Sequence, residues 1–256
     1  MSLVVAPAKL TLSLAVTGVR PDGYHELRAE MVALSLCDEL TITEGGQGLT
    51  VAGDPWTRAG TLAAGEANLI TRALRAVGRQ AGVHLVKRIP LGGGLGGGSS
   101  DAAAVLRWAG RADPGLAVAL GADVPFSVAG GRALVEGIGE RVTPLPFVPR
   151  RFVLAVPPFG VDTARVYAAW DDDPGLAHPN ALSAAALRVE PRLAAWRDAL
   201  GELAGSEPVL AGSGSTWFVE GGPAEAGTEA MPWLERGRDR ARLLRAHTVP
   251  SGWDGT

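Results

Sequence analysis

The stretch "KRIPLGGGLGGGSSDAAAVLRWAG", from Lys87 to Gly110, decides how the rest of this sequence is interpreted. Six glycines fall within residues 92–98, and Ser-Ser-Asp follows them directly. The residues before the glycines, 83–89, have the composition of a strand that ends at Pro90. The residues after them repeat at the spacing of one apolar helix face: Ala102, Val105, Leu106 and Ala109. The stretch therefore predicts a strand, a glycine loop and a helix.

A glycine loop that leads into a helix is suited to phosphate binding. The first N–H groups of a helix lack intrahelical partners, and they carry a partial positive charge. Glycines let the main chain approach an anion closely and adopt positive φ angles. The N-cap of the predicted helix falls at Ser99, Ser100 or Asp101.

A linker, a dinucleotide-binding fingerprint and a Walker loop each fit the glycine run less well. A flexible linker would lie between domains, whereas this run lies directly between a strand and a helix. A dinucleotide-binding fingerprint, at Gly92, Gly94 and Gly97, needs an acid on the next strand, but the nearest acid, Asp113, lies in a turn. A Walker loop needs Lys followed by Ser or Thr, and this chain has two serines after the glycines. A nucleotide phosphate loop of another kind is the interpretation that remains. An oxidoreductase or a nucleotide-binding module without catalysis stays open as an alternative.

Composition narrows the class of protein further. The chain has 256 residues, 46% hydrophobic residues and a formal net charge of −3, which favours a globular protein and gives no sign of nucleic-acid binding. Its one cysteine, Cys37, cannot form an internal disulfide, so a reducing compartment is expected. No stretch is long and apolar enough for a membrane span. We expect a cytoplasmic protein with no membrane or nucleic-acid partner.

Two further segments have clear local patterns. Residues 8–16 alternate with a period of two, which predicts a half-buried strand with Lys9 and Thr11 on the face away from the leucines. A lysine on that face lies in solvent unless the face borders a site. Residues 68–82 have helical spacing, and the predicted helix closes near Gly82.

Four segments of the chain resemble the GHMP small-molecule kinases, in the order that these enzymes have them. The segments are "APAKLTLSLAVTGVRPDGYHEL" near the N-terminus, "PLGGGLGGGSSDAA" at the loop, "LGADVPF" at residues 120–126 and "LAGSGSTWF" at residues 210–218. The loop marks the superfamily. The first and third segments are more specific, and they resemble the kinases that act on 4-diphosphocytidyl-2-C-methyl-D-erythritol.

The resemblance implies an α+β fold of two domains. The first, residues 1–147, would be related to the ribosomal-protein-S5 domain 2 and would bind ATP. The second, residues 148–256, would be ferredoxin-like. The implied reaction is ATP-dependent phosphorylation of the 2-hydroxyl of the diphosphocytidyl substrate in the non-mevalonate isoprenoid pathway. A GHMP kinase for another small alcohol is the alternative, and a monomer or weak homodimer is expected.

The same resemblance assigns the catalytic and ATP-binding residues. Asp123 would be the general base and Lys9 the cation beside it, although an aspartate before Val-Pro is also a plausible helix N-cap. ATP would arrive with Mg²⁺, for which no protein ligand is assigned firmly, and Asp101 is a second candidate acid. The implied ATP-binding residues are Pro90, Leu91, Gly92, Gly93, Gly94, Leu95, Gly96, Gly97, Gly98, Ser99, Ser100 and Asn68, of which Asn68 is also a plausible N-cap.

The implied substrate site holds a cytosine. Tyr24 and His25 would contact the base, and Tyr167 would lie opposite Tyr24. Two residues depart from the family pattern. Thr11, implied to contact substrate, stands where Asn is usual, and Ser215 stands where Pro is common.

Overall fold

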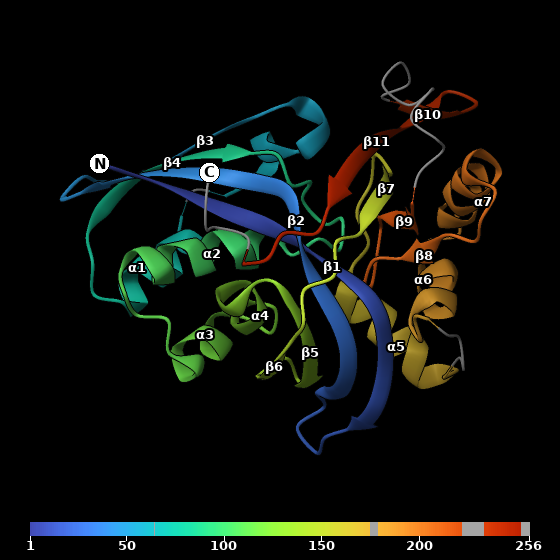
Figure 1. The fold of residues 1–256 in the computed structure, drawn as a ribbon, viewed down its shortest axis with the longest axis horizontal. Coiled ribbons are helices and arrows are strands. Elements are labelled where there is room, and N and C mark those ends of the chain that lie inside the picture. Colours follow the sequence, from blue (N-terminus) through green and yellow to red (C-terminus); the bar gives the residue numbers. More distant parts are fainter. Residues whose placement is uncertain (64, 175–178, 222–232, 252–256) are drawn as a thin grey trace.

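The computed structural model describes residues 1–63, 65–174, 179–221 and 233–251. It has two sheets side by side, each with its own helices (Figure 1). The first sheet consists of β1 (Ser2–Val19), β2 (His25–Glu44), β3 (Leu49–Gly53), β4 (Ala81–Lys87), β5 (Arg132–Gly137) and β6 (Arg141–Leu145). The second consists of β7 (Arg151–Val156), β8 (Val209–Leu210), β9 (Trp217–Glu220), β10 (Trp233–Arg236) and β11 (Asp239–His247). The expectation of an α+β fold is confirmed.

A long antiparallel hairpin of β1 and β2 organises the first sheet. One edge of β2 pairs with β1, while its other edge pairs with β5 near one end and with β4 near the other. The register of the hairpin shifts at three places, one of them between Pro7 and Lys9. Such irregularities re-aim side chains. The part of β1 that contains Lys9 and Thr11 is buried on both faces, because the segments around Gly96 and Gly212 cover the Lys9 side chain. The half-buried strand predicted there is therefore wrong at this point.

Four helices cover one face of the first sheet (Figure 1). They are α1 (Leu69–Ala76), α2 (Gly97–Trp108), α3 (Pro114–Leu120) and α4 (Val124–Ala129), and two short 3₁₀ turns, η1 (Pro55–Thr57) and η2 (Ala59–Thr61), precede α1. The helix predicted over residues 68–82 is too long. Gly78 adopts a left-handed φ of 65°, and Arg79 N donates to Leu74 O, so α1 ends there and β4 begins at Ala81.

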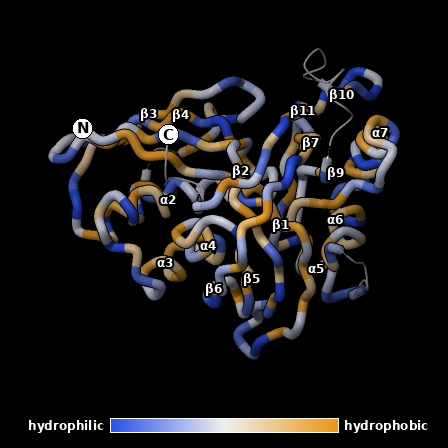
Figure 2. Tube along the Cα trace, viewed as in Figure 1, coloured by the Kyte–Doolittle hydropathy of each residue, from blue (hydrophilic) through white to orange (hydrophobic). Residues whose placement is uncertain are grey.

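The second sheet is antiparallel in the order β10-β11-β7-β9-β8. Its helices are α5 (Thr163–Asp172), α6 (Ser183–Val189) and α7 (Leu193–Ala204), on the right in Figure 1. Figure 2 shows hydrophobic residues along the strands and the helix faces between them, while the turn between β1 and β2 is hydrophilic.

The two halves of the chain share their cores. Two of the three hydrophobic clusters formed by the described residues contain residues from both sheets: one joins Leu14 and Phe126 to Leu182 and Trp217, and another joins Leu10 to Phe152 and Phe218. Main-chain hydrogen bonds also join the two halves: Leu14 N donates to Pro179 O and Ala181 N donates to Leu14 O, each at 2.9 Å. The sheets are therefore fixed against each other at the middle of β1, next to Lys9.

Candidate active site

The glycine loop between β4 and α2, residues 90–98, is called the phosphate loop below. Three of its glycines, Gly92, Gly94 and Gly96, have positive φ angles of 65°, 78° and 67°. Gly96 is the N-cap and α2 begins at Gly97, so the N-cap predicted at Ser99, Ser100 or Asp101 is wrong by three residues or more. A left-handed N-cap without a side chain lets the loop run into the helix with its first N–H groups uncovered.

The phosphate loop is held by a second glycine segment, residues 210–218, called the C-terminal glycine motif. A Cβ on Gly94 would lie 2.2 Å from Ala211 O and 2.8 Å from Gly214 O, so no side chain fits at Gly94. Thr216 N donates to Gly93 O at 3.2 Å. The two motifs, far apart in sequence, therefore form one rigid glycine-lined wall.

The Lys9 side chain lies along this wall. A Cβ on Gly96 would come within 2.7 Å of Lys9 Cγ, and one on Gly212 would come within 3.3 Å of Lys9 Nζ. The ammonium group donates to Thr11 Oγ1 at 3.1 Å and lies 3.7 Å from Asp123 Oδ2. Lys9 is only 6% exposed, so its charge acts in a poorly hydrated place where electrostatic interactions are strong. Lys9, Thr11 and Asp123 therefore meet at the junction of both glycine motifs.

Asp123 lies at the start of α4, but its side chain makes no capping hydrogen bond. Its carboxylate is about one-third exposed and faces Lys9. By contrast, Asp113 caps α3, since its Oδ1 accepts from Leu116 N at 2.8 Å. The capping interpretation of Asp123 therefore has no hydrogen bond to support it, and the carboxylate stays available for chemistry.

Beneath the phosphate loop lies a charged group that we call the buried triad: Lys87, Asp38 and Asp101. Lys87 Nζ donates to Asp38 Oδ2 at 2.5 Å and to Asp101 Oδ2 at 2.8 Å, and the side chains are almost fully buried. Asp38 Oδ1 also accepts from the N–H groups of Arg88 and Ile89. Burial raises the pKa of the Asp101 carboxyl to about 7. Asp101 therefore faces Lys87 below the loop, and the structure gives it a structural role rather than that of a free acid near the phosphates.

The other residues implied for ATP have diverse surroundings. Leu95 is buried in the core and its carbonyl accepts from Lys9 N at 3.0 Å, while Ser100 Oγ donates to Pro7 O at 2.5 Å. Ser99 Oγ lies 3.9 Å from the position of a Cβ on Gly121, just before Asp123. Pro90 is buried at the start of the loop, and Leu91 N donates to Thr57 O at 3.0 Å.

Asn68 has the N-cap role that the sequence left open. Its Oδ1 accepts from Ile70 N at 2.9 Å, and its Nδ2 donates to Ala63 O at 2.8 Å. Both ends of the side-chain amide are therefore engaged within the chain.

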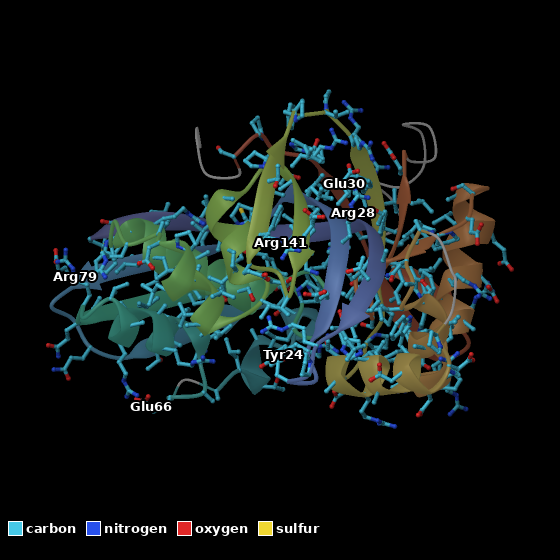
Figure 3. The ribbon with its side chains drawn as sticks, turned by 90° about the horizontal axis from the view of Figure 1, so that it is seen from below. Tyr24, Arg28, Glu30, Glu66, Arg79 and Arg141 are labelled. Atoms are coloured by element: carbon cyan, nitrogen blue, oxygen red, sulfur yellow. The ribbon has the colours of Figure 1, made fainter. Side chains whose placement is uncertain are left out.

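A cavity of about 580 Å³ lies beside Asp123, between the β1–β2 turn and α5. Tyr24, His25 and Tyr167 all line it, together with Ala122 and Thr163. Figure 3 shows Tyr24 near the tip of the hairpin. Burial, and after it the negative charge of Asp123, raises the pKa of Tyr167 above its ordinary value, which keeps its phenol neutral. The cavity therefore runs from an aromatic end toward the carboxylate.

The aromatic side chains are arranged differently from the expected tyrosine pair. His25 and Tyr167 have ring centroids 4.6 Å apart, whereas Tyr24 is 60% exposed on the rim. Nε2 of His25 lies 2.7 Å from Asp171 Oδ1, and the ring meets Trp170 edge-on. His25 is thus held between α5 side chains, and Tyr24 remains free to cover a ligand.

Sequence reasoning missed several residues that fix this site. Asn180 is 1% exposed, and its Nδ2 donates to the carbonyls of Leu210 and Gly212, which holds the C-terminal glycine motif in place. Ser215, which the sequence did mark as a departure from the family pattern, donates to Phe159 O at 2.6 Å. Asp38 and Lys87 were also missed. The one available signal was a lysine inside an apolar strand, which needs a buried partner.

Neither a metal-ligand cluster nor a membrane-spanning helix is found in the described residues. No group of three or more His, Cys, Asp or Glu side chains in these residues could hold a metal ion. No described helix has the length and apolar character that crossing a membrane requires.

Comparison with known proteins agrees with this geometry. Residues 68–131 match the model of the GHMP kinases N-terminal domain. The chain is 41% identical to the 4-diphosphocytidyl-2-C-methyl-D-erythritol kinase of Paracoccus denitrificans, over 97% of this chain and 93% of that protein. It is 39% identical to the enzyme of the same name from Salinispora arenicola, over 87% of this chain and 84% of that protein.

Solved structures show the same relation. A crystal structure of 4-(cytidine 5'-diphospho)-2C-methyl-D-erythritol kinase superposes with a TM-score of 0.74 and 34% identity, covering 96% of this chain and 98% of that one. A mevalonate kinase, 13% identical with a TM-score of 0.59 over 97% and 99% of the two chains, shows the shared fold alone. The chain therefore belongs to the 4-diphosphocytidyl-2-C-methyl-D-erythritol kinase family of GHMP kinases.

Proposed function

We propose that this chain transfers the γ-phosphoryl group of ATP to the 2-hydroxyl of 4-diphosphocytidyl-2-C-methyl-D-erythritol, giving the 2-phosphate and ADP in the non-mevalonate isoprenoid pathway. The observation that carries the proposal is the meeting of Lys9, Thr11 and Asp123 at the junction of two glycine motifs. That junction brings a base, a cation and an anion-binding main chain to one point. Those are the groups that phosphoryl transfer to an alcohol requires.

In this proposal Asp123 accepts the proton of the attacking hydroxyl while the new O–P bond forms and ADP leaves. Its carboxylate suits that role because it is partly exposed and has no capping hydrogen bond. Lys9 faces Asp123 and stabilises the negative charge that develops on the hydroxyl oxygen and the phosphoryl group. Thr11 fixes the ammonium group through its hydroxyl at 3.1 Å.

We assign the triphosphate to the phosphate loop, where left-handed glycines and the uncovered start of α2 offer N–H donors. Mg²⁺ is expected to arrive with ATP, where it neutralises phosphate charge. Asp101 is paired with Lys87 below the loop, so Asp123 is the carboxylate that faces the junction. Asn68 is proposed to lie near the adenine. Its side-chain amide is already hydrogen-bonded within the chain, so we assign it no hydrogen bond to the base.

The cavity beside Asp123 is proposed to hold the cytidine end of the substrate. A base inserted between the exposed Tyr24 and the His25–Tyr167 pair would be covered on both faces. Aromatic stacking contributes about 1–3 kcal/mol per base. The neutral phenol of Tyr167 can donate a hydrogen bond to the substrate.

The domain boundary, location and assembly are also proposals. The stretch between the end of β6 at Leu145 and the start of β7 at Arg151 supports a boundary near residues 147–148. A single free cysteine, Cys37, supports a cytoplasmic protein, and a monomer or weak homodimer remains the expected assembly.

The test is Asp123→Asn, with Asp113→Asn as a matched control. Both substitutions remove one carboxylate charge near a helix start, and Asn still serves as an N-cap at Asp113. We expect turnover of the cytidine substrate to fall at least ~10²-fold in Asp123→Asn while the Kd of ADP stays nearly constant. The control should keep wild-type turnover. Wild-type turnover in Asp123→Asn would show that Asp123 is not the general base.

A further inference from the structure

Arg58, on the short segment between β3 and α1, has a guanidinium group without an acceptor. Its Nε and Nη2 atoms are buried, and neither makes a hydrogen bond within the described residues. Burial lowers the pKa of Arg58 from its ordinary value, yet an arginine stays charged at neutral pH. Arg58 as a whole is half-buried, but polar atoms shielded from water are costly to leave unpaired and normally have a partner.

The backbone at Arg58 is unusual as well. Its φ of 62° and ψ of 21° make it the one non-glycine residue with positive φ in the described chain. The residue joins the turns η1 and η2, because its N–H donates to Pro55 O and its carbonyl accepts from Thr61. A bulky residue in this conformation costs free energy that a glycine would avoid. The arginine side chain is thus kept at a place where the backbone alone favours glycine.

The guanidinium group lies over the first glycine of the phosphate loop. Nη2 of Arg58 lies 3.8 Å from the position of a Cβ on Gly92, and Nη1 lies 3.5 Å from that on Gly160. Neither glycine has a side chain that could pair with the cation. Leu91 N donates to Thr57 O at 3.0 Å, which ties the segment to the loop.

The surrounding groups hold the segment without neutralising Arg58. Asp54, the nearest acid along the chain, accepts from Trp56 Nε1 at 3.2 Å. The Trp56 ring in turn lies 5.6 Å from the guanidinium carbon of Arg242 on β11, so the second sheet braces it. Arg58 is therefore fixed between both halves of the chain, and its Nε and Nη2 atoms have no acceptor in the part of the chain that the structure describes.

We infer that Arg58 binds the non-transferred phosphates of the nucleotide. The reacting end of the loop is at Gly96, against Lys9, whereas Arg58 lies at the opposite end, at Gly92. The positive charge of Arg58 would contact the phosphate groups that stay with ADP, and it would bind them equally in the ground state and in the transition state. It acts on nucleotide affinity rather than on turnover. The inference rests on the proposed function, since it requires the triphosphate to lie on this loop.

The test uses the full chain with ADP and Mg²⁺ in titration calorimetry, and adenosine as the probe without phosphates. Arg58→Gln should raise the Kd of ADP roughly 10-fold or more, because it removes charge-assisted hydrogen bonds. The Kd of adenosine should stay the same within about 2-fold, and in turnover assays the KM of ATP should rise far more than kcat falls. Arg58→Lys should recover part of the affinity.

Two further variants separate binding from folding. Arg58→Gly removes the strain of a non-glycine residue at positive φ, so this variant should be at least as stable as the wild type and still lose ADP affinity. Arg79→Gln removes an exposed arginine that pairs with Glu44 and lies at the left edge of the molecule in Figure 3, and this variant should bind ADP normally. Unchanged ADP affinity in both Arg58→Gln and Arg58→Gly would overturn the inference about Arg58 and leave the proposed function standing. Equal losses for ADP and adenosine would overturn the phosphate assignment. A wild-type chain that binds no ADP would overturn the proposed function with it.

Discussion

Replacing Lys87 by Met tests the buried triad under the phosphate loop. Methionine keeps a long apolar side chain but removes the ammonium group that donates to Asp38 at 2.5 Å and Asp101 at 2.8 Å. Two carboxylates then remain almost fully buried with no cation between them. Removal of one partner from a buried ion pair costs about 3–5 kcal/mol of unfolding free energy. For a chain of this size that corresponds to a fall in Tm of roughly 6–20 °C.

The assay is urea and thermal unfolding at pH 8, followed by circular dichroism. The double variant Lys87→Met with Asp101→Leu should recover part of the loss, because it removes one of the two uncompensated carboxylates. A loss below ~1 kcal/mol in Lys87→Met would show that the triad contributes little. A double variant no more stable than the single one would show that the carboxylate of Asp101 is not the cause.

Two other predictions use the same measurements or the turnover assay. Burial raises the pKa of Asp101 from 3.8 to about 7, so the folded chain holds a proton that the unfolded chain releases, and the unfolding free energy should fall as the pH rises between these values. Asp101→Asn should remove that slope in urea unfolding from pH 5 to pH 8, and an unchanged slope would assign it to another group. Tyr24→Ala removes the exposed cover of the cavity, so the KM of the cytidine substrate should rise roughly 5- to 100-fold while that of ATP changes little. Equal changes in both KM values would contradict the cytosine assignment.

Local patterns in the sequence were sufficient for much of the fold and for the identity of the chemical groups. The strand, glycine loop and helix around residues 83–109 follow from apolar spacing and glycine conformation, which are local properties. Local signals failed at element ends. α2 begins at Gly97, because Gly96, which packs against the Lys9 side chain, is the N-cap in a left-handed conformation that local apolar spacing does not predict.

The sequence by itself predicted a glycine loop suited to phosphate binding between β4 and α2, and its resemblance to the GHMP kinases pointed to Lys9 and Asp123 as candidates for the chemistry. Only the tertiary structure decided that Lys9 is buried against both glycine motifs, that Asp101 pairs with Lys87, and that Arg58 faces the loop with no partner among the residues described. The physical reason is that spacing along the chain reports local conformation. The charge state and availability of a side chain depend on burial and on partners that can lie more than 100 residues away.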